Sequence, residues 1–101
     1  MVRWQPYEDA SFVSGDSPVT LIPNTDLGVR AGDGYIVCDG PGTIQVEISS
    51  LDGVAFDPPF QLKEGDRISL KGGMAHTIRL THLGTDSAYR VLVLPLGPDI
   101  P

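Results

Sequence analysis

The sequence predicts an all-β protein: a small antiparallel β-sandwich or jelly-roll-like barrel of about seven short strands, with little or no helix. Apolar and polar residues alternate with a period of two in several short runs, which is typical of half-buried strands. Twelve Gly and nine Pro in 101 residues indicate frequent corners between those strands. No window shows the apolar spacing of an amphipathic helix. A chain of this length fits one domain with one modest core.

The stretch 58–80 is expected to hold three of these strands, folded tightly on one another. Its turns are Glu64–Asp66 and Lys71–Gly73, where Gly tolerates the positive φ that tight corners need. Apolar residues alternate with polar ones on both sides of the second turn, so we expect the apolar ones to face a core. These residues are Ile68, Leu70, Ile78 and Leu80.

Three further strands are predicted before this stretch. Val19–Ile22 is the first and stops at Pro23, and residues 25–34 are expected to form a loop because they are rich in Gly and Asp. Tyr35–Cys38 is apolar on both faces, which predicts a well-buried strand. Thr43–Ile48 has the cleanest alternation in the chain and is expected to form a hairpin with Tyr35–Cys38.

The remaining elements are interpreted in the same way. Val54–Phe56 predicts a short strand, which the two prolines that follow at 58 and 59 confine to an edge or a crossover. Residues 81–87 are expected to form a loop. Ala88–Leu94 is the most apolar run, and it predicts a strand in the middle of a sheet.

The chain divides into an N-terminal arm (1–18), a β-sandwich domain (19–95) and a Pro-rich C-terminal tail (96–101). The arm has no periodic pattern but holds aromatic residues, in which disordered tails are usually poor. Two interpretations of the arm stay open: its aromatic side chains fold back onto the chain's own core, or they anchor on a neighbouring subunit. The predicted interface residues, taken from both ends of the chain, are Trp4, Tyr7, Phe12, Pro98 and Ile100.

Composition argues against several classes of partner. The formal net charge is −6, and the seven Lys and Arg residues are scattered, so we expect no nucleic-acid binding. No segment is long and apolar enough to cross a membrane, and the N-terminus lacks the apolar core of a signal peptide. The single cysteine, Cys38, lies in a strand-like run and is expected to be a buried, inert thiol.

The sequence shows no catalytic constellation, so we expect neither an enzyme nor a cofactor. His76 and His82 are the only histidines, and in one strand they would lie about 20 Å apart. A zinc site needs more such ligands than the chain has, so no metal is expected. The loop aspartates lie beside Gly, Pro, Ser or Thr, where the formation of turns accounts for them. These are Asp26, Asp33, Asp39, Asp52, Asp57, Asp66 and Asp86.

A first resemblance concerns Gly65–Asp66 and, after four residues, Lys71–His76. This pattern is similar to the second motif of cupins, with Lys71 where that motif usually has Pro. The resemblance implies a jelly-roll-like turn and makes His76 the residue that would match a metal ligand. The upstream His-x-His motif that should complete the site is absent, because no histidine precedes position 76.

A second resemblance covers residues 19–94. Thr20–Leu27 resembles the "TPSDTTDL" opening of the small head-spike base proteins of tailed phages and gene transfer agents. The order of the later pieces is also similar to that family, and these pieces are Tyr35–Val37, Gly42–Glu47, Phe60–Ile68, His76–Leu80, Leu83–Asp86 and Val91–Leu94. The resemblance implies a structural virion protein, assembled in the host cytoplasm, that mounts a fibre on the capsid surface and is no enzyme.

Three functions therefore remain open. The first is an assembly module, a spike base or decoration protein that contacts capsid protein, spike fibre and other copies of itself as a homo-oligomer. The second is a small cupin-like protein that binds a metal or ligand through His76. The third is a carbohydrate-binding sandwich, which would need exposed aromatic side chains such as Tyr35 and Tyr89.

Overall fold

The computed structural model describes residues 4–70 and 75–95. Within these residues the chain is almost entirely β-structure, so the predicted fold class is confirmed. A 3-10 turn, η1 (Ser14–Asp16), and a five-residue helix, α1 (Pro23–Leu27), are the helical elements. The strands are β1 (Gln5–Phe12), β2 (Val19–Leu21), β3 (Ala31–Cys38), β4 (Ile44–Ser49), β5 (Phe60–Leu62), β6 (Arg67–Ser69), β7 (Thr77–His82) and β8 (Ser87–Pro95).

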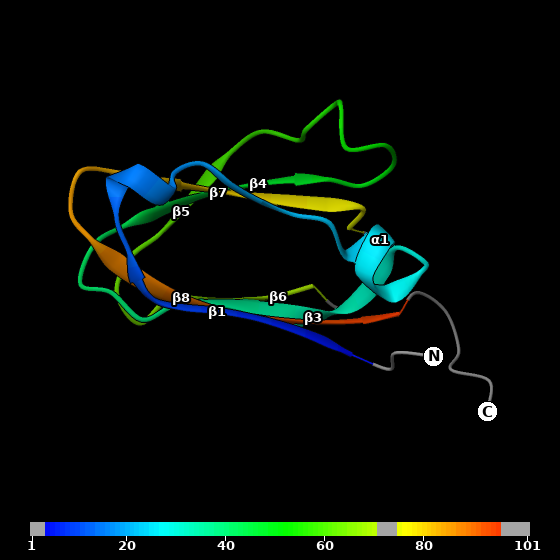
Figure 1. Ribbon diagram of the computed structural model, residues 1–101, viewed down its shortest axis with the longest axis horizontal. Helices are drawn as coiled ribbons and strands as arrows, with labels where there is room; N and C mark the ends of the chain where they lie inside the picture. The colour runs from blue at the N-terminus through cyan, green and yellow to red at the C-terminus, as the bar shows by residue number, and fades with distance from the viewer. Residues whose placement is uncertain (1–3, 71–74, 96–101) are drawn as a thin grey trace.

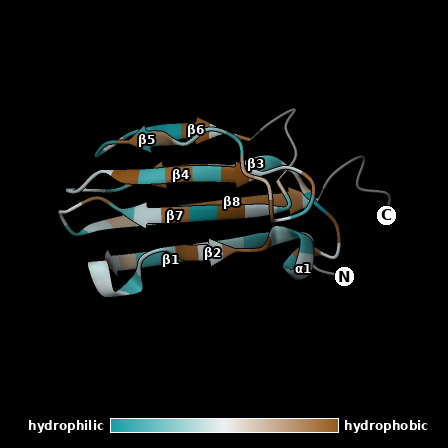
Figure 2. Ribbon diagram, turned by 90° about the horizontal axis from the view of Figure 1, so that it is seen from above, coloured by the Kyte–Doolittle hydropathy of each residue, from teal (hydrophilic) through white to brown (hydrophobic). Residues whose placement is uncertain are grey.

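The strands form two antiparallel four-stranded sheets that face each other (Figure 1). One sheet has the order β1-β8-β3-β6 and is called sheet A here, and the other has the order β2-β7-β4-β5 and is called sheet B. Seen from above, β2, β4, β5 and β7 lie over β1, β3, β6 and β8 respectively (Figure 2). Except for β4 and β5, which pair within sheet B, consecutive strands lie in different sheets, which is the arrangement of an eight-stranded jelly roll.

This topology shows that two predictions about strand pairing are wrong. Tyr35–Cys38 and Thr43–Ile48 were expected to form a hairpin, but they belong to different sheets, as β3 and β4. The three strands of the stretch 58–80 do not pair with one another either: β5 pairs with β4, β6 with β3, and β7 with β2 and β4. Alternation sets which face of a strand points inward, but it does not set which strand lies beside it.

The core lies between the two sheets and is built from the residues that alternation places inward. Ile78 and Leu80 of β7 are fully buried, and Ile44 and Val46 of β4 are at most 1% exposed. Leu70 is buried and Ile68 packs against the core from β6, as predicted. Burial of each large aliphatic side chain contributes about 1.5–3 kcal/mol. The predicted central position of the last strand is also confirmed, because β8 lies between β1 and β3.

The N-terminal region differs from the expected arm without periodic structure. Gln5–Phe12 forms strand β1, which pairs with β8 along its length. A register shift between Asp9 and Phe12 moves the inward position from odd to even residues. This irregularity hides the period of two, because Tyr7 and Phe12 do not have the spacing of a regular strand.

Strand β3 begins four residues earlier than expected, in a segment predicted to be a loop. Ala31–Gly34 is accommodated because the register against β8 shifts between Ala31 and Asp33. At Gly34, φ is +134°, and a Cβ atom there would lie 2.0 Å from the backbone oxygen of Leu92. Only glycine allows β3 to approach β8 this closely.

The predicted strand at Val54–Phe56 is absent from the structure, where these residues lie in the loop between β4 and β5. Asp52 organises this loop, because its Oδ1 accepts hydrogen bonds from the backbone N–H groups of Val54, at 2.9 Å, and Ala55, at 3.1 Å. The Ser49 hydroxyl accepts a further bond from the N–H of Gly53, at 2.8 Å. A short acidic side chain that bonds to the backbone ahead of it favours a turn over a strand.

Helix α1 closes one end of the sandwich, between the two layers (Figure 1). Pro23 and Leu27 are its buried residues, and Gly28 ends it with a φ of +83°. The backbone N–H of Asn24 donates to the carbonyl of His76, which joins the helix to the start of β7. Among the described residues, no helix has the length and apolarity that crossing a membrane requires.

The edges of both sheets offer little free backbone. The edge strands β2, β5 and β6 have three residues each. Pro18 and Pro59 directly precede β2 and β5. The longer edge strand, β1, contains Pro6, which has no N–H and whose carbonyl accepts a bond from the Gln5 side chain at 3.1 Å. Short strands and prolines of this kind discourage pairing with the edge of another molecule.

Candidate functional site

The structure separates the predicted interface residues of the N-terminal region. Phe12 is fully buried, and its ring makes edge contacts with the rings of Tyr89, at 5.4 Å, and His82, at 5.9 Å. Its prediction as an interface residue is therefore wrong, and the alternative that it folds back onto the chain's own core is confirmed. Trp4 is different, because it remains 59% exposed. Pro98 and Ile100, with the whole tail 96–101, lie outside the described residues.

Tyr7 is half-buried and links β1 to α1. Its hydroxyl donates a hydrogen bond to Oδ2 of Asp26. Burial raises the pKa of Tyr7 well above its ordinary value, and the hydrogen bond and negative charge of Asp26 raise it further. The neutral phenol therefore holds the helix against sheet A, so the hydroxyl of Tyr7 serves the fold.

His76 lies just before β7, next to the loop that follows β4. Its backbone N–H donates to the carbonyl of Ser49 at 2.8 Å, and its Nδ1 lies 2.8 Å from the hydroxyl oxygen of Thr77. In the described part of the chain, no group of three or more His, Cys, Asp or Glu side chains is placed to hold a metal ion. The turn at Gly65, which carries the cupin-like pattern, has the expected positive φ of 86°.

His82 and Cys38 both belong to the interior. His82 was expected in a loop but ends β7, where its Nε2 lies 2.9 Å from Oδ1 of Asp86 and its ring contacts Phe12. Cys38 is fully buried, as predicted, and its thiol donates to the carbonyl of Gly42 at 3.2 Å. The Ser87 hydroxyl donates to the same carbonyl at 2.7 Å, so both side chains fix the turn after β3.

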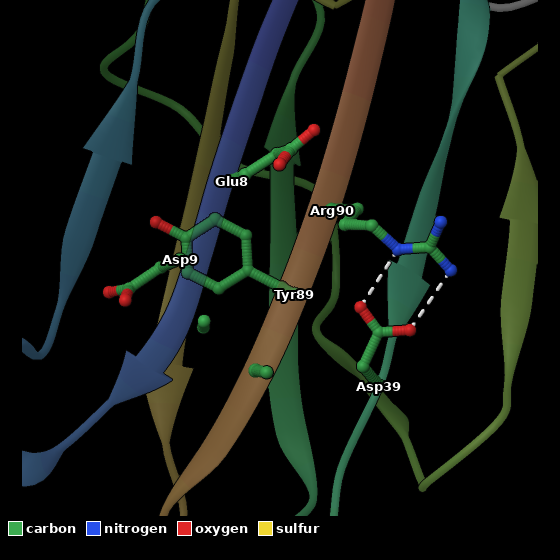
Figure 3. A pocket seen from close by; sticks show the side chains of 7 residues that line it. Glu8, Asp9, Asp39, Tyr89 and Arg90 are labelled. Carbon is green, nitrogen blue, oxygen red and sulfur yellow. Dashed lines mark hydrogen bonds and ion pairs between the residues drawn. The ribbon is translucent and has the colours of Figure 1, made fainter.

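A shallow pocket of about 300 Å³ opens on the outer side of sheet A (Figure 3). Arg90 reaches from β8 toward Asp39, and its Nε and a terminal nitrogen donate to the two carboxylate oxygens at 2.8 and 3.0 Å. These bonds raise the pKa of Arg90 above its ordinary value. Because the guanidinium is already paired, the pocket has no free cation for an anionic ligand. Its lining consists of Glu8, Asp9, Ala10, Asp39, Ala88, Tyr89 and Arg90.

The carbohydrate-binding alternative needs exposed aromatic rings, and the structure does not provide them at the two predicted tyrosines. Tyr89 is 5% exposed and packs against Phe12. Tyr35 is half-buried, and the guanidinium of Arg67 lies over its ring at 4.6 Å from the ring centre. A sugar that stacks on Tyr35 would first have to displace this cation–π contact.

Most of the large exposed apolar side chains belong to segments at the end of the sandwich that α1 closes. Six such side chains are exposed among the described residues, and five belong to segments at this end: the start of β1, the two flanks of α1, and the loop after β4 (Figure 1). The sixth, Leu83, lies in the loop between β7 and β8 at the opposite end. The five residues, called the apolar end below, are Trp4, Ile22, Val29, Leu51 and Val54.

Backbone contacts hold these segments together. His76 bonds to Asn24 of α1 on one side and to Ser49 at the end of β4 on the other. The loop that carries Leu51 and Val54 is fixed by Asp52, so both side chains are displayed on an ordered backbone. Sequence analysis found Trp4 but missed the other four residues, because an isolated aliphatic residue in a loop carries no periodic signal.

Comparison of the chain with protein-family models, with curated proteins and with solved structures finds no match.

Proposed function

We propose that this chain is a structural component of a phage or gene transfer agent particle, a spike base or decoration module that works through protein–protein contacts. The observation that carries the proposal is the apolar end, where the segments at one end of a small acidic protein carry five of the six exposed large apolar side chains of the described residues. Exposed apolar surface of this kind is typical of regions that bind another protein.

The geometry of the loop after β4 supports this function. Val54 and Leu51 are 82% and 68% exposed, although Asp52 and Ser49 fix the backbone between them. A rigid anchor loses little conformational entropy when a partner covers it, so its burial contributes more fully to affinity. The order of similar segments from Thr20 to Leu94 is the support for a head-spike base in particular.

The proposal is tested on particles released by cells that carry this gene. The particles are purified on a density gradient, and the chain is quantified by mass spectrometry against the major capsid protein. We expect the chain to travel with the particles at a fixed ratio to capsid protein. A chain found only in the particle-free fractions contradicts the proposal.

A pair of matched variants then tests the apolar end. The double variant Leu51→Ser, Val54→Ser should be lost from the particles, because it removes two of the apolar side chains proposed to contact the partner. Both side chains are exposed, so their removal should leave the core unchanged. Leu83→Ser is the control, since it removes an exposed leucine at the opposite end. Equal incorporation of both variants would show that the apolar end is not the contact.

A further inference from the structure

The outer side of sheet A is a second, separate surface, called face A here. Tyr89, Val91 and Val93 of β8 point into the core, so the residues between and beyond them point outward. The register between strands sets which outward residues of β1, β3 and β6 lie beside them. Face A consists of Pro6, Glu8, Asp33, Tyr35, Val37, Asp39, Arg67, Ser69, Arg90, Leu92 and Leu94.

One row across face A is apolar at three of its four positions. Pro6 of β1 is opposite Leu92 of β8, Leu92 is opposite Tyr35 of β3, and Tyr35 is opposite Ser69 of β6. Leu94 of β8 extends the apolar surface along the strand, opposite Asp33 of β3. Strands that are apolar on both faces are normally covered on both faces. The described part of the chain covers only the inner side of β3 and β8 and places no third layer over face A (Figure 1).

The next row is charged at three of its four positions, including its two ends. Glu8 is opposite Arg90, Arg90 is opposite Val37, and Val37 is opposite Arg67. The side chains of Glu8 and Arg67 are both exposed, and within the described residues neither takes part in an ion pair. The row therefore begins on β1 with the carboxylate of Glu8, whose charge also acts on Arg90, and ends on β6 with a guanidinium that stacks on Tyr35.

Face A is also nearly neutral, unlike the rest of the molecule. Its region holds two cations, Arg67 and Arg90, against three anions, Glu8, Asp33 and Asp39, whereas the whole chain has a net charge of −6. Two copies of a strongly acidic protein repel each other over most orientations. Face A is a surface on which a second copy meets little of this repulsion.

We propose that two copies of this chain bind each other through face A, around a two-fold axis that runs parallel to the strands between β8 and β3. This axis places β1 of one copy over β6 of the second copy, and β8 over β3 of the second copy. Leu92 then packs on Tyr35 of the second copy, and Glu8 lies opposite Arg67 of the second copy. Every contact occurs twice, as a two-fold interface requires.

Self-complementarity is the reason to choose a second copy as the occupant of this face. At the centre of the first row, Leu92 meets Tyr35 of the second copy, and in the second row the end that carries Glu8 meets the end that carries Arg67. Two sheets whose strands stay nearly aligned pack face to face in the way that sandwich layers do. The inference goes beyond the proposed function and does not depend on it, because face A and the apolar end hold different contacts.

The test measures self-association by sedimentation equilibrium of the full chain. Dimers are expected at concentrations on the order of 100 µM. Leu92→Lys should raise the dissociation constant by at least about 30-fold, because it puts a charge at the centre of the buried row. Thr81→Lys is the matched control, at an outward position of the central strand β7 in sheet B, and should leave the constant unchanged. Circular dichroism and the thermal midpoint check that both variants fold.

The orientation of the two-fold axis is tested by exchanging the charges at the ends of the second row. Glu8→Lys alone and Arg67→Glu alone should each weaken the dimer by about 3- to 10-fold, since each brings like charges together. The double variant Glu8→Lys, Arg67→Glu should recover most of the lost affinity between the two copies. A dimer that Leu92→Lys disrupts but that the double variant does not recover overturns the proposed axis.

A wild-type chain that remains monomeric at about 1 mM overturns the dimer itself, since a specific contact should be populated there. This result would assign face A to another protein or to the chain's own termini. Incorporation into particles is a separate result. A chain that is monomeric but travels with particles would support the proposed function and refute the dimer. A chain that dimerises but is absent from particles would support the dimer and contradict the proposed function.

Discussion

The outer faces of the two sheets have the same strand geometry and different chemistry. On sheet A the outward residues of the two central strands combine the apolar Tyr35, Val37, Leu92 and Leu94 with the charged Asp33 and Arg90. On sheet B the corresponding strands, β7 and β4, display polar side chains, and the edge strands add more of the same kind. These residues are Thr20, Gln45, Glu47, Gln61, Arg79 and Thr81.

The polar face satisfies its charges internally. Glu47 accepts two hydrogen bonds from Arg79, at 3.0 and 3.1 Å, and the guanidinium of Arg79 lies 4.1 Å from the ring centre of Phe56 in the loop after β4. The same bonds raise the pKa of Arg79 above its ordinary value. Sheet B thus presents a polar surface whose charges are paired, whereas sheet A keeps apolar side chains and the carboxylate of Glu8, which forms no ion pair within the described residues.

The largest expected effect is the loss of unfolding free energy when Gly34, beneath face A, is replaced. Gly34→Ala puts a Cβ 2.0 Å from the carbonyl oxygen of Leu92 and forces an L side chain into a φ of +134°. The unfavourable backbone conformation costs about 1–3 kcal/mol, and the steric overlap costs about 1–3 kcal/mol more. Urea denaturation should show this loss of unfolding free energy, and the contacts of Tyr35 and Leu92 should be disturbed with it.

Gly15→Ala is the control for this substitution. No atom lies within 4 Å of its added Cβ, and its φ is not in the left-handed region. The unfolding free energy should change by less than about 0.5 kcal/mol. Equal stability of the two variants would mean that β3 and β8 do not approach each other as described.

The second effect distinguishes core leucines from face leucines. Leu80→Ala removes a fully buried side chain of β7 and should cost about 2–5 kcal/mol of unfolding free energy. Leu92→Ala removes a half-buried side chain of face A, and should cost about 1 kcal/mol in the monomer. The measurement is chemical denaturation at low concentration, where dimers are absent. A loss for Leu92→Ala as large as that for Leu80→Ala would assign Leu92 to the fold and not to association.

The third effect compares one glutamate from each face. Glu47→Gln weakens the two-point contact with Arg79 and should lower the thermal midpoint by about 2 °C. Glu8→Gln should leave the midpoint of the monomer unchanged, because Glu8 forms no ion pair within the described residues. Thermal unfolding in low salt measures the midpoints of both variants and shows which substitution is the more destabilising. If Glu8→Gln were the more destabilising variant, face A would already be satisfied within one chain.

The smallest effect is local and concerns the loop that borders the polar face. The N–H groups of Val54 and Ala55 hold the pKa of Asp52 below its ordinary value of 3.8. A lowered folded-state pKa stabilises the loop above that value, and the stabilisation is lost as the pH falls through the lower, folded-state pKa. The amide NMR signals of Val54 and Ala55 should therefore shift together in acid.

Asp52→Asn should abolish that titration and leave the global unfolding transition nearly unchanged. Asp57→Asn is the control, since its carboxylate makes no hydrogen bond among those found in the described residues, and the two amide signals should titrate as before. If the two signals still titrated in Asp52→Asn, another carboxylate would have to fix this loop.

Much of the fold could be predicted because alternation reports directly on burial. Ile44, Val46, Ile78 and Leu80 were placed inward correctly, since each faces a core on one side only. Pairing could not be predicted, because it depends on the turn after Cys38, which carries the chain across the sandwich and not back along it. Strand β1 escaped detection because its register shift breaks the period that identifies a strand.

The candidate surfaces were only partly visible in the sequence. Trp4 drew attention as an aromatic residue in a polar segment, and the same argument misplaced Phe12, which the structure buries. Face A had a signal, since Tyr35–Cys38 is apolar on both sides of the strand. That signal was interpreted as burial within one chain, because a single sequence does not say whether the second cover belongs to the same molecule.

The short edge strands and their prolines limit the size of the assemblies that this protein can form. Since β2, β5 and β6 are short and β1 carries Pro6, growth by adding strand to strand is disfavoured at the edges of both sheets. A dimer that buries face A of both copies has no second face A with which to bind a third molecule. A high concentration of the protein would then yield dimers and no fibrils.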